Sequence, residues 1–345
     1  MFQRTWRDTG LLAVAIALGF AIFNLAQLLS HPFLLLLAGT VLACALAPIA
    51  GAAERWVPRV VSVLLVYLVV ALVLAGIGWL IAPALVEQAQ MLVENAPALA
   101  EEAEAWINDR GLPIDGNLTE QFETVLTEGA RTIVFLAPST FQAGFDILFV
   151  VALSAYLTVS GPAMLDFTIT LFPPERREHA RETLVEMGST MGGYVRGSLL
   201  DGAIIGTITW VVLSVLGVDF PLVLALVAFL GELIPVLGPL LAAVPAITIA
   251  ALDTITLGIV VAVFYFVLQQ FESYVLLPNI MRQQADIPPL LTLVALLAGA
   301  ALAGFVGAIL AIPLFGGLWV LFKRVAVPAV RRESGAPEAG RMLEE

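Results

Sequence analysis

The chain alternates long apolar runs with short polar stretches, and the lengths of the runs predict membrane helices. Each run is close to or longer than the ~20 residues that cross a ~30 Å hydrocarbon core as a helix. The runs are Leu11–Leu29, Phe33–Ala50, Val60–Ile81, Phe141–Val159, Gly197–Leu216, Leu222–Leu252, Thr254–Leu277 and Leu290–Phe322. The pattern therefore predicts an all-α, polytopic membrane protein with about eight membrane segments.

Two of these runs fit neither one crossing nor two. Leu222–Leu252 and Leu290–Phe322 exceed a single span with ordinary tilt, yet two crossings need about 40 residues. Both contain helix-interrupting residues: Pro235, Gly238, Pro239 and Pro245 in the first, and Gly299, Gly304, Gly307 and Pro313 in the second. Interrupted backbone survives at membrane depth where it is buried in protein or lines a wet cavity. We therefore expect two broken or re-entrant segments whose tips, Pro235–Pro239 and Ala298–Gly307, meet near the midplane.

The pattern changes over residues 87–140, which are rich in acids and contain only Arg110 and Arg131 as bases. Apolar residues recur there at steps of three and four, as on one face of a helix: Leu85, Ala89, Leu92, Ala96, Leu99, Ala103 and Trp106. A break at Arg110–Asn117 predicts that a second helix returns. This acidic helical insertion has two interpretations: a vestibule or oligomerisation hairpin, or a solvated insertion whose acids keep it soluble.

A basic and acidic stretch, Ser160–Arg196, separates the fourth and fifth runs. Its apolar residues Ala180, Leu184 and Met187 share a helical face, which is typical of an interfacial helix lying on the membrane; a solvated connector is the alternative. The chain thus divides into consecutive parts: 1–86 with three spans, the insertion 87–140, 141–196 with a span and interfacial helix, a transport core 197–330, and a disordered cytoplasmic tail 331–345.

Arginine and lysine predict the orientation, because short cytoplasmic loops are enriched in them. Loops at Arg4–Arg7 and Arg55–Arg59, the 160–196 stretch and the end at Lys323–Arg332 share one side if the first five segments each cross once. The acidic insertion falls on the other side. We expect a multi-pass cell-membrane protein with both termini in the cytoplasm and the insertion as an extracytoplasmic helical hairpin.

Composition supports this class and excludes others. Hydrophobic residues make up 60% of the chain and charged residues 13%, and the mean hydropathy is +0.98, far from a soluble domain. The net charge of −12 argues against nucleic-acid binding. Cys44 is the only cysteine, and His31 and His179, the only histidines, lie outside the runs. No His-Glu-x-x-His site, Ser–His pair or P-loop is available, so we expect no enzyme, cofactor or metal site.

Polar residues within the apolar runs are the candidate site. Glu232 stands at the break in Leu222–Leu252, where a charge at membrane depth is expensive. Gln269, Gln270 and Glu272 end the seventh run, and Gln269 and Glu272 share a helix face. Asp201 follows Arg196, and both are expected near the cytoplasmic interface. A carboxyl group in a low-dielectric site could carry a proton during transport.

Each carboxylate also has a structural interpretation without function. Proline kinks are common in membrane helices, so Glu232 could face the lipid headgroups. Glu272 could be an interfacial acid paired with Arg282.

Two C-terminal segments carry distinctive motifs. Gly192–Ala246 carries a Tyr-x-Arg-Gly segment, then an Ile-Pro-x-x-Gly-Pro segment and a later Pro-Ala. Gln269–Leu314 carries Gln and Glu before a Leu-x-Pro-x-Ile-Met run, and a Gly-x-x-Gly segment that ends in Ala-x-Pro. In these motifs the chain resembles the autoinducer-2 exporter family of membrane transporters; the resemblance covers most of the chain and is densest in its C-terminal half. Pro288 stands where the family usually has a histidine, so no role of that histidine carries over.

The resemblance implies a secondary transporter. Family members have been linked to signal-molecule export and to sodium–proton exchange. The expected function is export of a small polar, autoinducer-like molecule or exchange of cations, coupled to a proton or sodium gradient. The expected partners are that small molecule or ion, the lipid bilayer and other copies of the chain. The alternative is a passive oligomeric channel or membrane scaffold, because nothing in the sequence demonstrates alternating access.

Overall fold

The computed structural model describes residues 31–109, 124, 141–234, 237–280 and 288–328. Within these ranges all regular structure is helical, which confirms the all-α prediction. The first predicted span, Pro235, Arg282, most of the returning insertion helix and the 331–345 tail lie outside the described residues.

The elements follow one another with few residues between them. After the His31–Ala53 helix come α2 (Arg59–Asp109), α4 (Phe141–Thr170), α5 (Arg177–Leu216), α6 (Pro221–Gly231), α7 (Leu237–Asp253), α8 (Ile255–Phe271), α9 (Leu277–Ile280) and α10 (Pro289–Leu321). Short turns add the 3₁₀ helix Pro174–Arg176 and the π-helical turns Glu272–Leu276 and Phe322–Ala326.

Six of the described helices are long and apolar enough to cross a bilayer, and α6 and α7 are shorter apolar helices. Large apolar side chains on α2, α4 and α10 are exposed, as expected where lipid takes the place of protein neighbours. The described part of the chain is therefore a multi-pass helical membrane protein.

Two helices run through boundaries expected from the polar stretches. The predicted third span and the start of the acidic insertion form one helix, α2. The amphipathic segment after Pro174 and the fifth span likewise form one helix, α5, which ends at Gly217 with a φ of 74°. Polar residues do not end these helices because a helix that leaves the bilayer can continue in water.

The run Leu222–Leu252 forms a helical hairpin. Its arms α6 and α7 pack against each other, and they cross most closely at Gly231 and Gly238. A Cβ atom on Gly238 would lie 1.9 Å from the Gly231 carbonyl oxygen. Glycine at both positions therefore permits the close crossing.

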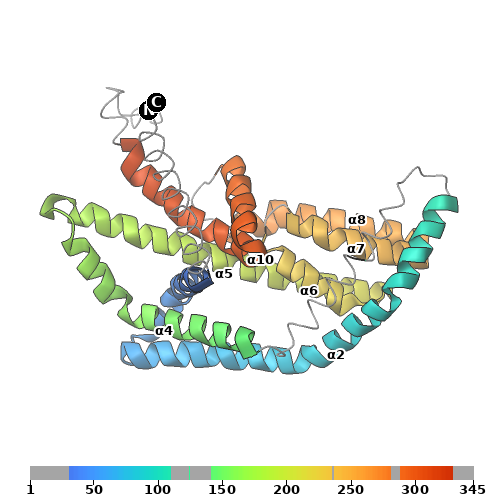
Figure 1. Ribbon diagram of the computed structural model, residues 1–345, viewed down its shortest axis with the longest axis horizontal. Helices are drawn as coiled ribbons and strands as arrows, with labels where there is room; N and C mark the ends of the chain where they lie inside the picture. The colour runs from blue at the N-terminus through green and yellow to red at the C-terminus, as the bar shows by residue number, and fades with distance from the viewer. Residues whose placement is uncertain (1–30, 110–123, 125–140, 235–236, 281–287, 329–345) are drawn as a thin grey trace, which may run out of the picture.

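The run Leu290–Phe322 also reverses, although it forms the single element α10. The helical dihedrals fail at Ala303 (φ −147°) and Gly304 (φ 60°), and a positive φ favours glycine. The two arms cross at Gly299 and Gly307, where a Cβ on Gly299 would lie 2.4 Å from the Gly307 carbonyl oxygen. Figure 1 shows the two arms of α10 at an angle to each other.

The first hairpin packs against the arms of the second. Ile234, at the end of the first, is buried in one cluster with Leu296, Ala308 and Ile312, which lie on either side of the reversal at Ala303 and Gly304. The two interrupted segments are therefore in contact, whereas the meeting of their tips stays a prediction. Their position relative to a bilayer stays a prediction.

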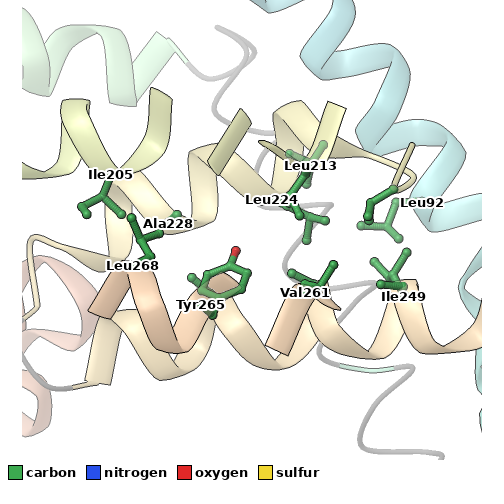
Figure 2. Close-up of a cluster of buried hydrophobic side chains, with 14 of the residues drawn as sticks. Leu92, Ile205, Leu213, Leu224, Ala228, Ile249, Val261, Tyr265 and Leu268 are labelled. Atoms are coloured by element: carbon green, nitrogen blue, oxygen red, sulfur yellow. The ribbon is translucent and has the colours of Figure 1, made fainter. Parts of the chain in front are cut away.

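The largest apolar core joins α5, α6, α7 and α8 (Figure 2). From α2, Ala89 and Leu92 are 0% and 3% exposed and belong to this core, with Leu85 packed against it. The first half of the predicted oligomerisation stripe thus packs within its own chain, so it offers no face to a second copy.

Two arginines bond carbonyl groups that helix prolines leave free, because proline has no N–H for the carbonyl four residues earlier. Pro162 lies inside α4, and Arg59 donates to the Thr158 carbonyl at 2.6 Å. Pro48 frees the Cys44 carbonyl in the same way, and Arg196 donates to it at 3.3 Å. These bonds tie the two proline-containing helices to α2 and α5.

Candidate functional site

Three carboxylates from three different elements meet at the first hairpin tip. Asp201 comes from the middle of α5, Glu232 from the end of α6 and Glu272 from the turn after α8. One oxygen of each lies within 4.8 Å of the others, and the residues are 2%, 7% and 6% exposed, respectively.

Asp201 lies on the face of α5 that approaches α6. Gly202 and Gly206 follow it, and a Cβ on either would come within 3.1 Å of an α6 backbone carbonyl oxygen. Small residues four apart permit such close helix packing. Asp201 is consequently buried beside α6, whereas Arg196 bonds the carbonyls of Cys44 and Ala45.

Glu232 caps the C-terminus of α6, and its backbone N–H bonds the Ala228 carbonyl at 3.2 Å. The next two residues form a turn before the hairpin tip. The side chain thus points into protein and not toward headgroups. The interruption in the sequence places this carboxylate beside α5.

Glu272 begins a π-helical turn that spans Glu272–Leu276. Such turns insert one residue into a helix and are frequent at functional sites. The Gln269 side-chain amide donates to a Glu272 carboxylate oxygen at 3.0 Å, so the predicted pairing of these two residues on one face is confirmed. That bond orients Glu272 toward the other two acids.

No described cationic side chain forms an ion pair with the three carboxylates; the ion pairs of the described residues lie elsewhere. Two unit charges 4.8 Å apart repel by about 3 kcal/mol at an effective dielectric constant of ~20. Three such pairs would offset much of the typical 5–15 kcal/mol of folding stability. The cluster therefore needs bound protons or a bound cation.

A small cavity of ≈ 10 Å³ opens beside the cluster, which is room for about one water molecule. Its lining residues are Ile205, Ala228, Glu232, Pro239, Ala242, Tyr265, Leu268, Gln269 and Glu272. Figure 2 shows the Tyr265 hydroxyl pointing away from α8 toward the neighbouring helices. A proton carrier or a monovalent cation fits this space, whereas an organic molecule does not.

Only some of the predicted site residues come together. Asp201, Glu232, Gln269, Glu272 and Pro239 come together at the cluster or its cavity. Gln270 is exposed on the other face of α8. The glycines and proline of the second hairpin, namely Gly299, Gly304, Gly307 and Pro313, shape its crossing and arms but do not line the cavity.

Tyr265 and Gly231 were not among the predicted residues. In the sequence Tyr265 is one of several aromatic residues in an apolar run. Only its contact with the cavity in the structure distinguishes it from the others. Gly231 precedes Glu232, and its partner Gly238 was predicted. The pairing of two glycines across a short turn was the signal available in the sequence.

The AI-2E family transporter model matches residues 11–326. The chain belongs to the AI-2E transporter family. The Bacillus subtilis protein named "Putative transport protein YrrI" is 32% identical over 75% of this chain and 76% of its own length. The Mycobacterium tuberculosis protein named "Putative transport protein MT0215" is 29% identical over 89% of this chain and 86% of its own length. A Methanothermobacter thermautotrophicus protein named "Putative transport protein" is 26% identical over 96% of this chain and 98% of its own length.

AI-2E membership confirms the resemblance seen in the two C-terminal motifs. The matched region contains the cluster and both hairpins. The names of the relatives describe transport and no catalysis. The chain is therefore a member of a family of membrane transporters.

Proposed function

We propose that this AI-2E transporter exchanges cations across the membrane and binds them at the cluster of Asp201, Glu232 and Glu272. The observation that carries the proposal is three buried carboxylates within 4.8 Å and without an ion-pair partner among the described residues. Such a cluster holds either protons or a metal cation, and the two compete for the same oxygens. Competition at one site is the basis of exchange.

Hard monovalent cations such as sodium prefer oxygen ligands, which carboxylates and the Gln269 carbonyl can supply. The cavity volume of ≈ 10 Å³ favours a proton or a small cation over a signal molecule. In this proposal a proton gradient moves sodium, or a sodium gradient moves protons. Export of a small polar molecule would need a wider conformation.

The test uses purified protein in liposomes that contain a pH-sensitive dye, with the membrane potential clamped by potassium and valinomycin. An outward sodium gradient should acidify the interior, because sodium leaves as protons enter. Glu232→Gln should abolish the response. Glu182→Gln is the matched control, because Glu182 lies on α5 but is exposed and pairs with Arg324.

Equal responses of wild type and Glu232→Gln would refute the assignment of the cluster. A passive channel predicts a different result: with the potential clamped, sodium would cross down its gradient without moving protons uphill. Measuring radioactive sodium efflux together with the dye signal separates these two functions.

A further inference from the structure

A second feature adjoins the cluster: a line of buried polar atoms without hydrogen-bond partners. Among the described residues six buried side-chain atoms make no hydrogen bond of normal geometry. One of them belongs to Glu186, which forms an ion pair with Arg324. The other five are Tyr194, Ser198, Asp201 and Thr209 of α5, and Tyr265 of α8.

The four α5 residues follow one face of the helix. Steps of four and three lead from Tyr194 through Ser198 to Asp201, and Thr209 lies about two turns further. Ser198, Asp201 and Thr209 are 2%, 2% and 0% exposed. From Tyr194 to Thr209 the helix rises about 22 Å, which is most of a ~30 Å hydrocarbon core.

The line extends on both sides of the carboxylates. Tyr194 lies one turn before Ser198 and close to Glu232 and Asp201; its hydroxyl approaches that of Ser198, although neither makes a hydrogen bond of normal geometry within the described residues. On the far side Tyr265 lines the cavity at Glu232 and Glu272. Its hydroxyl is close to that of Thr209, although neither hydroxyl makes a hydrogen bond of normal geometry within the described residues.

Unpartnered buried hydroxyls are costly, and native proteins satisfy nearly all of them. The same chain does so elsewhere: Tyr67 is as buried as Tyr265 (9% against 8% exposed), yet its hydroxyl bonds Ser154 and Thr158. The contrast shows that the line on α5 is a local feature. Water is the partner that buried polar groups use when protein supplies none.

We infer that water molecules follow this face of α5 and form a proton path that reaches the carboxylate cluster from both directions. The inference rests on the proposed function. Hydroxyl groups and waters each accept one proton and donate another, so they can relay charge without being consumed.

Water on this path can be detected without measuring transport. X-ray radiolysis converts water close to a side chain into hydroxyl radicals, and mass spectrometry counts the modified tyrosines. With the wild-type protein in lipid nanodiscs, Tyr265 should be modified several times faster than Tyr67. The comparison is matched, because both side chains are buried to the same extent. Equal, slow modification of the two tyrosines would overturn the water path.

The second measurement is proton movement in the liposome assay. Tyr265→Phe keeps the ring and removes only the hydroxyl, so the rate of sodium-driven proton movement should fall several-fold. Vesicles without sodium should show no proton leak with this variant. Tyr67→Phe should leave the rate unchanged. If Glu232→Gln abolishes exchange but Tyr265→Phe matches wild type, the water path fails and the exchange function stands. If Glu232→Gln has no effect, the function itself fails.

Discussion

Replacing Gly238 by alanine tests whether the close hairpin crossing positions Glu232. The added Cβ would lie 1.9 Å from the Gly231 carbonyl oxygen and 2.2 Å from its carbon. An unstrained carbon–oxygen contact is about 3.3 Å, so the arms must separate by roughly 1.4 Å. The obstacle is backbone, so no rotamer change can relieve it. Overpacking of this kind costs about 1–3 kcal/mol.

The expected results are a lower unfolding temperature and loss of exchange. One kcal/mol shifts the unfolding midpoint of a mid-sized domain by about 2–4 °C, and the displaced tip carries Glu232 away from Asp201. Thermal unfolding in detergent and the liposome assay measure the two effects. Gly76→Ala is the control, because nothing lies within 4 Å of its Cβ and alanine favours the helix by up to ~1 kcal/mol.

If Gly238→Ala unfolds at the same temperature as Gly76→Ala and transports normally, the close crossing does not position Glu232. A lower unfolding midpoint of Gly238→Ala together with normal transport would confirm the steric conflict between the hairpin arms. It would also show that this conflict does not displace the Glu232 carboxylate.

The remaining predictions concern the arginine contacts and the topology. In an unfolding assay Arg59→Gln should lower the stability of the fold by about 2–4 kcal/mol, because charged hydrogen bonds to α4 carbonyls are lost. The control Arg55→Gln changes an exposed residue and should cost under about 1 kcal/mol. Arg324→Gln removes two ion pairs to α5. Because both pairs are partly exposed, the loss of stability should stay under about 1 kcal/mol for each pair and should be smaller in high salt. Single cysteines at Asp219 and Asp253, in a cysteine-free background, should both react with an impermeant maleimide from outside sealed cells; labelling of only one would contradict a hairpin that enters and leaves on one side.

The hairpins could be predicted from sequence because the length of an apolar run and the helix-breaking residues inside it are both visible within one stretch of the chain. Leu222–Leu252 is too long for one crossing, and its prolines prevent a straight helix. Gly304 supplies the positive φ that the second reversal needs. Which residues cross closely was harder to predict, since that depends on the angle between two arms.

The cluster was predicted only in part. Glu232 and Glu272 stand out as acids in apolar runs, whereas Asp201 was expected near the interface because Arg196 is close to it in sequence. Arg196 instead satisfies the carbonyl that Pro48 frees. Sequence proximity is a poor guide here because a helix places residues five apart on different faces.

Helix ends were the least predictable feature. Charged residues after Pro174 suggested a separate interfacial helix, but α5 continues through them to Leu216. A polar stretch ends a membrane span without ending the helix, because a helix satisfies its own backbone groups in either solvent. The polar positions along α5 at Tyr194, Ser198 and Asp201 were visible as a periodic pattern, yet their burial was not.

The three carboxylates differ in how firmly the fold holds them, and this difference bears on how cation binding could drive movement. Asp201 lies within α5, which packs against α4, α6 and α10. Glu232 follows the last turn of α6, and Glu272 begins a π-helical turn. Both of these positions are easier to displace than the middle of a helix. Under the proposed function, neutralising the cluster draws the hairpin tip and the π turn toward α5, and release of the cation lets repulsion of about 3 kcal/mol per charged pair push them apart. A ligand shifts a conformational equilibrium only by its differential affinity for the two states. The repulsion between these acids makes the affinity for a cation differ between the closed and the separated arrangement. A neutral site of the same shape would lack this difference in affinity.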